Sequence, residues 1–213
     1  MNITELSYKD NTVYTKIYNS PEINTREMLR YAGVRTDVLE LEEVFNDCLD
    51  EIGGQLVYKV CFRTFPIATD GKTLDLGFCK VKSEALAKNL TGCEGILLFG
   101  ATVGIGLDRL IARYSRLLPS KALMFQAIGA ERIEALCDAF CKDVSACLSS
   151  DGRRARPRFS PGYGDLGLEI QKDIFAVLDC PRKIGLTLNE SLLMSPTKSV
   201  TAIVGIKKST NTD

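Results

Sequence analysis

The chain of 213 residues is 45% apolar and 25% charged, the composition of a globular protein large enough to bury a core. Its 27 basic and 27 acidic residues cancel, so the net charge gives no reason to expect nucleic acid or an anionic membrane as a partner. The absence of histidine excludes Ser–His and Cys–His nucleophile systems, so any chemistry must come mainly from a cofactor or a bound substrate.

The N-terminal part predicts two helices after an extended, polar lead-in over residues 1–20. Asn24 and Glu27 have the spacing of a capping box for a short helix that Gly33 ends. Thr36 opens a second helix, which a Gly-Gly pair stops. Apolar residues at alternating spacings of three and four give that helix one buried face: Val38, Leu41, Phe45, Cys48 and Ile52.

Strands follow. Residues 55–67 are rich in β-branched and aromatic side chains and predict a strand. The turn residues ATDG at 68–71 predict a hairpin into a half-buried strand at 72–81, where apolar and polar residues alternate. Residues 83–90 predict a short helix capped by a serine, and GILLFGA at 95–101 predicts a strand covered on both faces.

The C-terminal half predicts a helix at 103–118, a longer helix after Pro119, a third at 168–178, and strands at 184–193 and 198–206. The longer helix carries an apolar stripe: Ile133, Leu136, Phe140, Val144 and Cys147. Because helices and strands come in blocks, we expect one α+β domain over 1–213 with a mostly antiparallel sheet and a frayed tail at 207–213.

The cysteine pattern and the chain start indicate a cytoplasmic protein. The eight cysteines form no Cys-x-x-Cys pair, so we expect reduced, mostly buried thiols instead of a metal site. Cys137 and Cys141 are predicted to share a helix face. No signal-peptide pattern opens the sequence, and no apolar run approaches the roughly 20 residues of a membrane helix.

Two candidate sites have simple structural explanations. One is a set of glycines between a strand and a helix: Gly100, Gly104 and Gly106. They suit either a phosphate-binding turn or tight strand-to-helix packing. The other is a row of arginines on one helix face: Arg109, Arg113 and Arg116. They suit either a solvated face or a docking surface for an acidic partner.

The segment RPRFSPGYGD, residues 156–165, is the strongest candidate site. Its prolines fix φ, and Gly162 permits a sharp turn or the close approach of a ligand. Arg158 offers a planar fork that matches a carboxylate, and Tyr163 offers a ring with a hydroxyl. Together these groups suit a zwitterionic, ring-bearing small molecule, although a rigid connector whose tyrosine packs on the core explains the segment equally well.

RFSPGY at 158–163 resembles the Arg-x-x-Pro-Gly-Tyr signature of the activation domain of cobalamin-dependent methionine synthase. IGLTLNESLLMSPTKSV at 184–200 is similar to a second motif of that domain, in the same order. RFSPGYGDLGLEIQKDIFAVLD at 158–179 looks even more like the free-standing members of the family. Three further stretches resemble their start and middle, namely REMLRYAG, ATVGIGLDRLIARY and ALMFQAIGAERIEALCD, so the resemblance spans 22–206.

The resemblance implies a helmet-like α+β domain with a curved, mostly antiparallel sheet flanked by helices. It also implies binding of S-adenosylmethionine and docking over a cobalamin that a partner protein carries. In the family, a donor such as flavodoxin reduces inactive cob(II)alamin, and S-adenosylmethionine then methylates the cobalt. The chain is thus expected to be the reactivation component of a split methionine synthase or a related corrinoid methyltransferase.

Carried over by position, the resemblance gives each residue of the turn a role. Arg158 would hold the methionyl carboxylate, and the backbone of Ser160 would meet the ligand. Gly162 and Tyr163 would complete the turn, with the ring beside the ligand and near the corrin face.

Two alternatives stay open. GDLGLE follows Gly-Tyr where the long enzymes have Pro-x-Cys-Pro, and Gly152 stands where the family has an acidic residue. The domain is therefore alternatively a corrinoid-protein docking module that has lost S-adenosylmethionine binding. GATVGIG after a strand suggests instead a conventional methyltransferase, which needs a parallel sheet.

Overall fold

The computed structural model describes residues 6–8, 11–33 and 39–209, without the side chains of 39–42. The helices are α1 (Thr25–Tyr31), α2 (Leu39–Ile52), α3 (Glu84–Asn89), α4 (Gly106–Leu117), α5 (Pro119–Ser150), α6 (Ile170–Leu178) and α7 (Cys180–Ile184), with a 3-10 turn at Gly53–Gln55. The strands are β1 (Tyr14–Tyr18), β2 (Tyr58–Pro66), β3 (Ala68–Thr69), β4 (Leu74–Asp75), β5 (Lys80–Val81), β6 (Gly95–Thr102), β7 (Arg153–Ala155), β8 (Thr187–Leu188), β9 (Met194–Ser195) and β10 (Ser199–Lys208).

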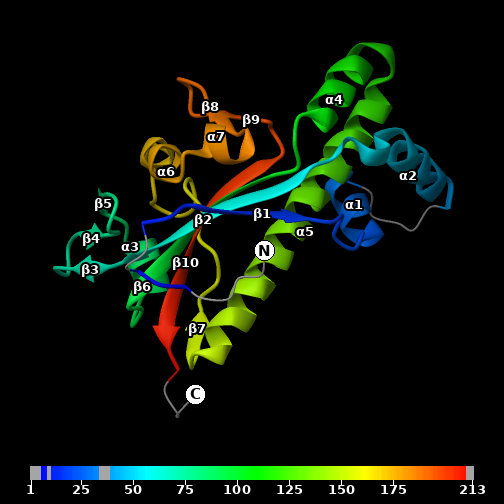
Figure 1. Ribbon diagram of the computed structural model, residues 1–213. Coiled ribbons are helices and arrows are strands. Elements are labelled where there is room, and N and C mark those ends of the chain that lie inside the picture. The colour runs from blue at the N-terminus through cyan, green and yellow to red at the C-terminus, as the bar shows by residue number, and fades with distance from the viewer. Residues whose placement is uncertain (1–5, 9–10, 34–38, 210–213) are drawn as a thin grey trace.

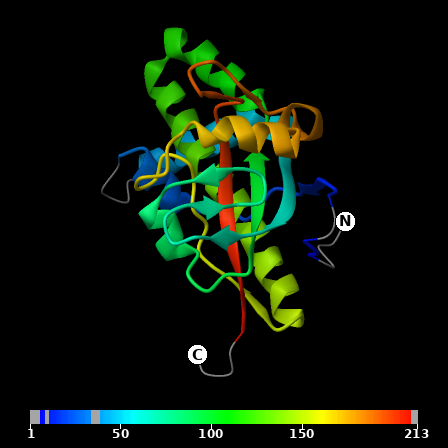
Figure 2. The same cartoon turned by 90° about the vertical axis from the view of Figure 1, so that its left-hand side faces the viewer.

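A curled antiparallel sheet of five strands, in the order β1-β2-β6-β10-β7, forms the centre of the molecule (Figure 1). The long helix α5 covers one face, and α6, α7 and α3 cover the other. The small sheet β3-β4-β5 lies below α6 on that second face (Figure 2). The fold is therefore α+β with a mostly antiparallel sheet, as the sequence predicts.

The position of strand β6 in the middle of the sheet explains why its sequence is continuously apolar. Leu97 and Phe99 pack in the core on the α5 side, whereas Ile96 and Leu98 pack in the core on the α6 side. Every residue of β6 is buried because both faces of the sheet are covered. The predicted strand at 95–101 is confirmed.

Helix α5 places its predicted stripe on the sheet. Ile133, Leu136, Phe140, Val144 and Cys147 all belong to the core between α5 and the sheet. The Phe140 ring lies with its centroid 4.9 Å from that of Phe99 on β6 and 5.2 Å from that of Phe62 on β2. Aromatic contacts of this kind fix the helix against the middle of the sheet.

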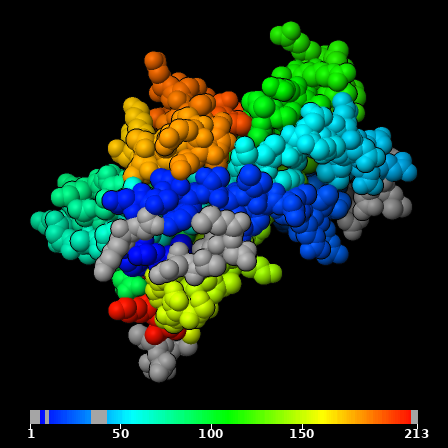
Figure 3. All heavy atoms as spheres, viewed as in Figure 1, coloured from blue at the N-terminus to red at the C-terminus, as the bar shows by residue number. Residues whose placement is uncertain are grey.

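A third core joins α1, α2 and α4 to the N-terminal half of α5. Phe45, Cys48 and Ile52 of the predicted α2 face are buried in it. Thr36 and Val38 lie outside the described residues, as does the side chain of Leu41. In the space-filling view a notch separates α4 and the start of α5 from the lobe that contains α6 to β9 (Figure 3).

Some boundaries differ from the sequence expectations for local reasons. The lead-in contains β1, which pairs with β2 along Tyr14–Tyr18. The predicted strand at 72–81 divides into β4 and β5, because Gly77 has a φ of +77° and reverses the chain. Strand β10 continues through Lys208, two residues into the expected tail, because β7 pairs with its end.

The short helix α7 was not expected from the sequence. Asp179 takes a left-handed conformation with a φ of 49°, which ends α6, and Pro181 then starts a new turn.

None of the helices within the described residues has both the length and the apolar character that crossing a membrane requires.

Candidate ligand-binding site

The first half of the segment 156–165 extends the edge of the sheet. The Arg156 N–H donates to the Gly205 carbonyl of β10 over 2.8 Å. Phe159 and Ile203 then exchange two backbone hydrogen bonds, each of 2.8 Å. Phe159 is buried on the α6 side, so Arg158, its neighbour in an extended segment, faces α5. Arg158 is thus placed by the register of an extended strand.

The second half is a tight turn that requires glycine. Gly162 has a φ of +85°, and a Cβ there would lie 2.9 Å from Leu168 Cδ2. The Gly162 N–H donates to the Leu166 carbonyl over 2.8 Å, and the Tyr163 N–H donates to the Ser160 carbonyl over 3.1 Å. The turn is therefore closed by its own backbone.

Tyr163 stands at the tip of this turn. Its ring meets the Phe159 ring edge-on, with centroids 5.4 Å apart, but the residue is 70% exposed. A tyrosine so exposed does not serve the core, which argues against the simple connector in which it packs inward. Its ring is a flat surface presented outward.

Asp165 anchors the turn to α3, which sequence reasoning missed. Its carboxylate accepts hydrogen bonds from Ser83 Oγ, from the Glu84 N–H over 2.7 Å and from the Ala85 N–H over 3.2 Å. These bonds, that from Ser83 foremost, hold the pKa of Asp165 below its ordinary value. Ser83 caps α3 as predicted, since its Oγ also accepts from the Leu86 N–H over 3.0 Å.

Arg158 lies against two carboxylates of α5. Its Nη2 donates to Glu134 and lies 3.4 Å from Asp138 Oδ1. Its Nη1 is buried and has no hydrogen-bond partner within the described residues. Burial alone would lower the pKa of Arg158, but Cys137, Glu134 and Asp138 together outweigh burial and raise it. The guanidinium therefore stays a cation with one donor nitrogen free.

Cys137 and Cys141 share a face of α5, as predicted, and both lie near Arg158. Burial raises the pKa of each thiol above its ordinary value, so both stay protonated. All eight cysteines are free thiols. Within the described part of the chain, no group of three or more cysteine or acidic side chains is placed to hold a metal ion.

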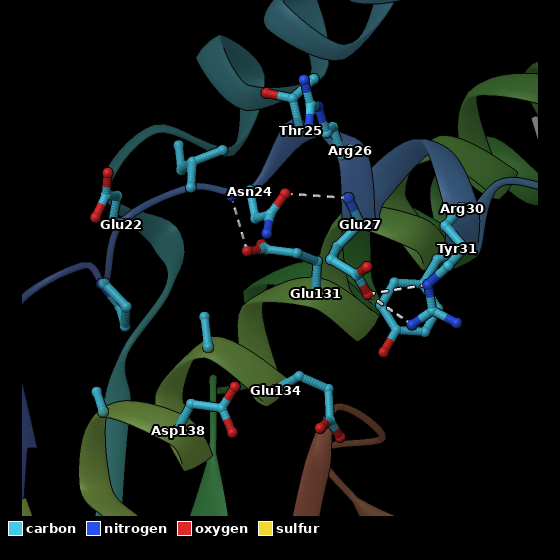
Figure 4. A pocket seen from close by; sticks show the side chains of 14 residues that line it. Glu22, Asn24, Thr25, Arg26, Glu27, Arg30, Tyr31, Glu131, Glu134 and Asp138 are labelled. Atoms are coloured by element: carbon cyan, nitrogen blue, oxygen red, sulfur yellow. Dashed lines mark hydrogen bonds and ion pairs between the residues drawn. The ribbon is translucent and has the colours of Figure 1, made fainter. Parts of the chain in front are cut away.

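A groove of about 830 Å³ lies between the segment 21–31 and α5 (Figure 4). Glu134 and Asp138, the two carboxylates beside Arg158, belong to its α5 wall. Glu27 and Arg30 of α1 lie at the opposite side in Figure 4 and pair with each other over 2.6 Å. The groove and the turn at 158–163 are therefore connected through the Arg158 ion pairs.

A buried ion pair fixes the N-terminal wall of this groove. Arg132 is 1% exposed and binds both carboxylate oxygens of its neighbour Glu131. It also donates to the carbonyls of Pro21 and Glu22, each over 2.7 Å. Glu131 Oε1 accepts from the Asn24 N–H over 3.0 Å. The wall is thus tied to α5 through its backbone.

The hydrogen bond from the Asn24 N–H to Glu131 changes the predicted capping box. Asn24 Oδ1 accepts from the Glu27 N–H over 3.2 Å, so Asn24 caps α1 as expected. The Glu27 carboxylate does not return to the Asn24 N–H, which Glu131 already occupies, and binds Arg30 instead. Gly33 follows the helix end with a φ of +76°.

The three glycines, Gly100 within β6 and Gly104 and Gly106 after it, serve packing. Gly100 faces Cys61 and Cys180, Gly104 lies on Val57, and Gly106 lies on the Gln55 backbone. All strand pairs within the described residues are antiparallel, which contradicts the conventional methyltransferase with its parallel sheet. The arginine row of α4 is exposed, and Arg113 lies 3.9 Å from Glu51.

No protein-family model matches the chain, and no curated protein matches its sequence. Among solved structures, the fold is similar to the crystal structure of the MetH reactivation domain bound to AdoHcy, with a TM-score of 0.65. The match covers 91% of this chain and 78% of that chain, at 14% sequence identity. The chain therefore has the fold of a MetH reactivation domain, in agreement with the fold that its motifs predict.

Proposed function

We propose that the protein binds S-adenosylmethionine at Arg158–Tyr163 and is the reactivation component of a cobalamin-dependent methionine synthase or a related corrinoid methyltransferase system. The observation that carries the proposal is Arg158, whose Nη1 is buried without a partner among the described residues and whose Nη2 pairs with two carboxylates that line a groove. The fold supports it, because the MetH reactivation domain of the same fold binds AdoHcy, the demethylated form of S-adenosylmethionine.

The site fits the amino-acid end of such a ligand. Arg158 Nη1 is a donor for an α-carboxylate, while Glu134 and Asp138 are acceptors for an α-ammonium group. The groove volume of about 830 Å³ lies within the ~300–1,000 Å³ of typical small-molecule sites. Ser160 and Gly162 follow Arg158 in the same turn, and the Tyr163 ring is exposed at the tip of that turn.

When bound, S-adenosylmethionine supplies an electrophilic methyl group on a sulfonium centre, for transfer to the cobalt of a corrinoid that a partner protein carries as substrate. A donor of the flavodoxin type would first reduce that substrate. The residues of this chain would hold the ligand in line with the cobalt and present the exposed Tyr163 ring to the partner. Because methyl transfer to a metal removes no proton, the chain needs no histidine base.

The second candidate function is a corrinoid-protein docking module without S-adenosylmethionine binding. The observation in its favour is that Glu134 and Asp138 already engage Arg158, so that a ligand carboxylate must compete with them. The two candidates differ in one measurable property, which is the affinity of the isolated protein for S-adenosylmethionine.

Calorimetric titration with S-adenosylmethionine tests the proposal. We expect saturable binding to the wild-type protein and a loss of about 2 kcal/mol, or roughly thirtyfold in Kd, in Arg158→Ala. Arg182→Ala is the matched control, because Arg182 is an exposed arginine of α7 that pairs with Asp179. Equal affinity in Arg158→Ala and the wild type would remove Arg158 from the site.

A second assay tests the reaction. Purified protein, a cobalamin-loaded methionine synthase subunit and a chemical reductant are incubated with S-adenosylmethionine, and AdoHcy is quantified. We expect AdoHcy only when all components are present. Co-purification with the corrinoid protein but no S-adenosylmethionine binding would instead support the docking module.

A further inference from the structure

Four half-buried side chains form a strip on the α5 side of the sheet: Lys198, Val200, Ser160 and Arg158. The chain neighbours Phe159, Ser199 and Thr201 are buried. Val200 packs on the core that α5 covers. Lys198 lies two residues before it, and residues two apart in an extended segment share a face. Because Phe159 pairs with Ile203, the register brings Ser160 beside Ala202, so the segment 158–160 continues the strip. Lys198 and Arg158 are its two cationic ends.

Lys198 is held at both its backbone and its side-chain stem. Its carbonyl accepts from the Val103 N–H over 3.1 Å, and the preceding Thr197 N–H donates to Asp108 over 2.9 Å. The stem crosses α5 at Gly129, where an added Cβ would lie 2.9 Å from both Lys198 Cγ and Cε. The same Cβ would lie 2.2 Å from Leu107 Cδ2, so the glycine makes room for both Leu107 and the lysine stem.

The ammonium group, in contrast, has no direct partner in the part of the chain that the structure describes. Among the described residues, Lys198 Nζ makes no hydrogen bond and no ion pair within 4.0 Å. Burial lowers the pKa of Lys198 below its ordinary value, and the more distant Asp108 offsets only part of this effect. A cation that loses water without gaining a partner is costly, so a fixed, unpaired lysine is a donor available to a ligand.

Lys198 and Arg158 contact α5 at different positions along its length. Lys198 contacts α5 at Gly129, and Arg158 contacts it at Glu134 and Asp138. These positions are separated by about 8 to 14 Å along the helix axis. A ligand whose amino-acid end lies at Arg158 can therefore place its nucleoside end toward Lys198.

We propose that Lys198 is a specificity residue of the same site and that its ammonium group donates hydrogen bonds to the oxygen or nitrogen acceptors of the nucleoside part. This inference rests on the proposed function, which places the amino-acid end at Arg158. It assigns the two ends of the ligand to two cations from different parts of the chain.

Fragments of the ligand test the assignment. The probes are S-adenosylmethionine, methylthioadenosine, which lacks the amino-acid end, and S-methylmethionine, which lacks the nucleoside; the two fragments are measured by ligand-observed NMR. We expect Lys198→Met, which keeps an unbranched stem on Gly129, to weaken the first two about tenfold and to leave S-methylmethionine unchanged. Arg158→Ala is expected to weaken S-methylmethionine and to spare methylthioadenosine.

Lys198→Arg and Lys172→Met complete the design. The arginine variant keeps a donor and should retain most of the affinity, whereas Lys172 is exposed on α6, on the opposite face of the sheet, and its substitution should change nothing. Wild-type affinity in Lys198→Met, or an equal loss for all three probes, would overturn the role of Lys198 and leave the proposed function standing. No binding of S-adenosylmethionine to the wild-type protein would overturn both.

Discussion

Arg158 and Glu134 lie 24 residues apart in the sequence, yet their side chains form an ion pair between the turn at 158–163 and helix α5. Each partner is fixed on its own side, Arg158 by the pairing of Phe159 with β10 and Glu134 by the packing of α5 on the sheet. The pair therefore sets how far the loop stands from the helix. Any ligand carboxylate that reaches Arg158 must share it with Glu134.

The first prediction concerns this competition. In Glu134→Gln, Arg158 loses a charged partner, and a bound ammonium group keeps only a neutral acceptor at this position. We expect S-adenosylmethionine to bind about tenfold more weakly, because the charged hydrogen bond to its ammonium group is lost. Its deaminated analogue should bind as well as or better than to the wild type, because Arg158 is freed. Calorimetry with both ligands measures the difference.

Asp173→Asn is the control for that experiment, since Asp173 is an exposed acid of α6 on the other side of the sheet. Its affinities for both ligands should equal those of the wild type. If Glu134→Gln weakens the two ligands by the same factor, Glu134 does not read the ammonium group.

The second prediction concerns Asp165, which ties the turn to α3. In Asp165→Ala, three hydrogen bonds are lost, while the backbone bonds within the turn and the contact between the Tyr163 and Phe159 rings remain. We expect faster amide exchange at Gly162 and Tyr163, with the sheet unchanged, and weaker binding of S-adenosylmethionine. Hydrogen exchange read by mass spectrometry checks the first effect.

Asp70→Ala provides the comparison, because Asp70 holds the β3–β4 hairpin in a similar way through the Lys72 and Thr73 N–H groups. Its loss should raise exchange in that hairpin and leave Gly162 and Tyr163 protected. Unchanged exchange of the turn in Asp165→Ala would show that its internal bonds are sufficient to hold it.

The sequence predicts the core elements because their signals are local. The apolar stripe of α5 packs on one face of the sheet, and β6 is covered on both of its faces. Each arrangement requires apolar residues at regular or consecutive positions, so the pattern is visible in the sequence. The turn at 158–163 is predictable for a similar reason. Gly162 and the prolines restrict the backbone whatever surrounds them.

The contacts that build the site join residues far apart in the sequence, so no short sequence pattern predicts them. Asp165 reaches Ser83 across 82 residues, and Arg132 reaches the Glu22 carbonyl across 110. A capping box was predicted in full at Asn24 and Glu27, but Glu131 takes one of its bonds. Tertiary partners replace local ones wherever a buried carboxylate lies nearby, and only the fold determines where that happens.

The third prediction concerns the buried pair that holds the groove wall. Arg132→Met leaves Glu131 buried without its cation and frees the carbonyls of Pro21 and Glu22. We expect the free energy of unfolding to fall by about 3–5 kcal/mol. Urea denaturation followed by circular dichroism measures it.

The double variant Glu131→Gln/Arg132→Met separates charge from shape. It removes both charges, so part of the lost stability should return, although Asn24 keeps only a neutral acceptor. If the double variant is as unstable as the sum of the two single variants, the pair is not coupled and the groove wall is held by other contacts.

The last prediction concerns acid stability through Asp143 of α5, which pins the edge strand β1. Its Oδ2 accepts from Lys16 Nζ over 2.5 Å and from Tyr18 Oη over 2.6 Å. Burial alone would raise the pKa of Asp143, but the bonds from Lys16 and Tyr18 outweigh burial and hold the pKa below its ordinary value.

A depressed pKa in the folded state fixes the sign of the effect. The contribution of Asp143 is fully present above its unfolded pKa of about 4, and it is lost as the pH falls through the lower folded value. Asp143→Asn should therefore be less stable than the wild type near neutral pH, and the difference should shrink in acid. Urea denaturation of both proteins between about pH 3 and pH 7 measures it, and curves that stay parallel would contradict the role of Asp143. Because β1 lies at the edge of the five-stranded sheet and pairs with β2, its amides should gain exchange first in the variant.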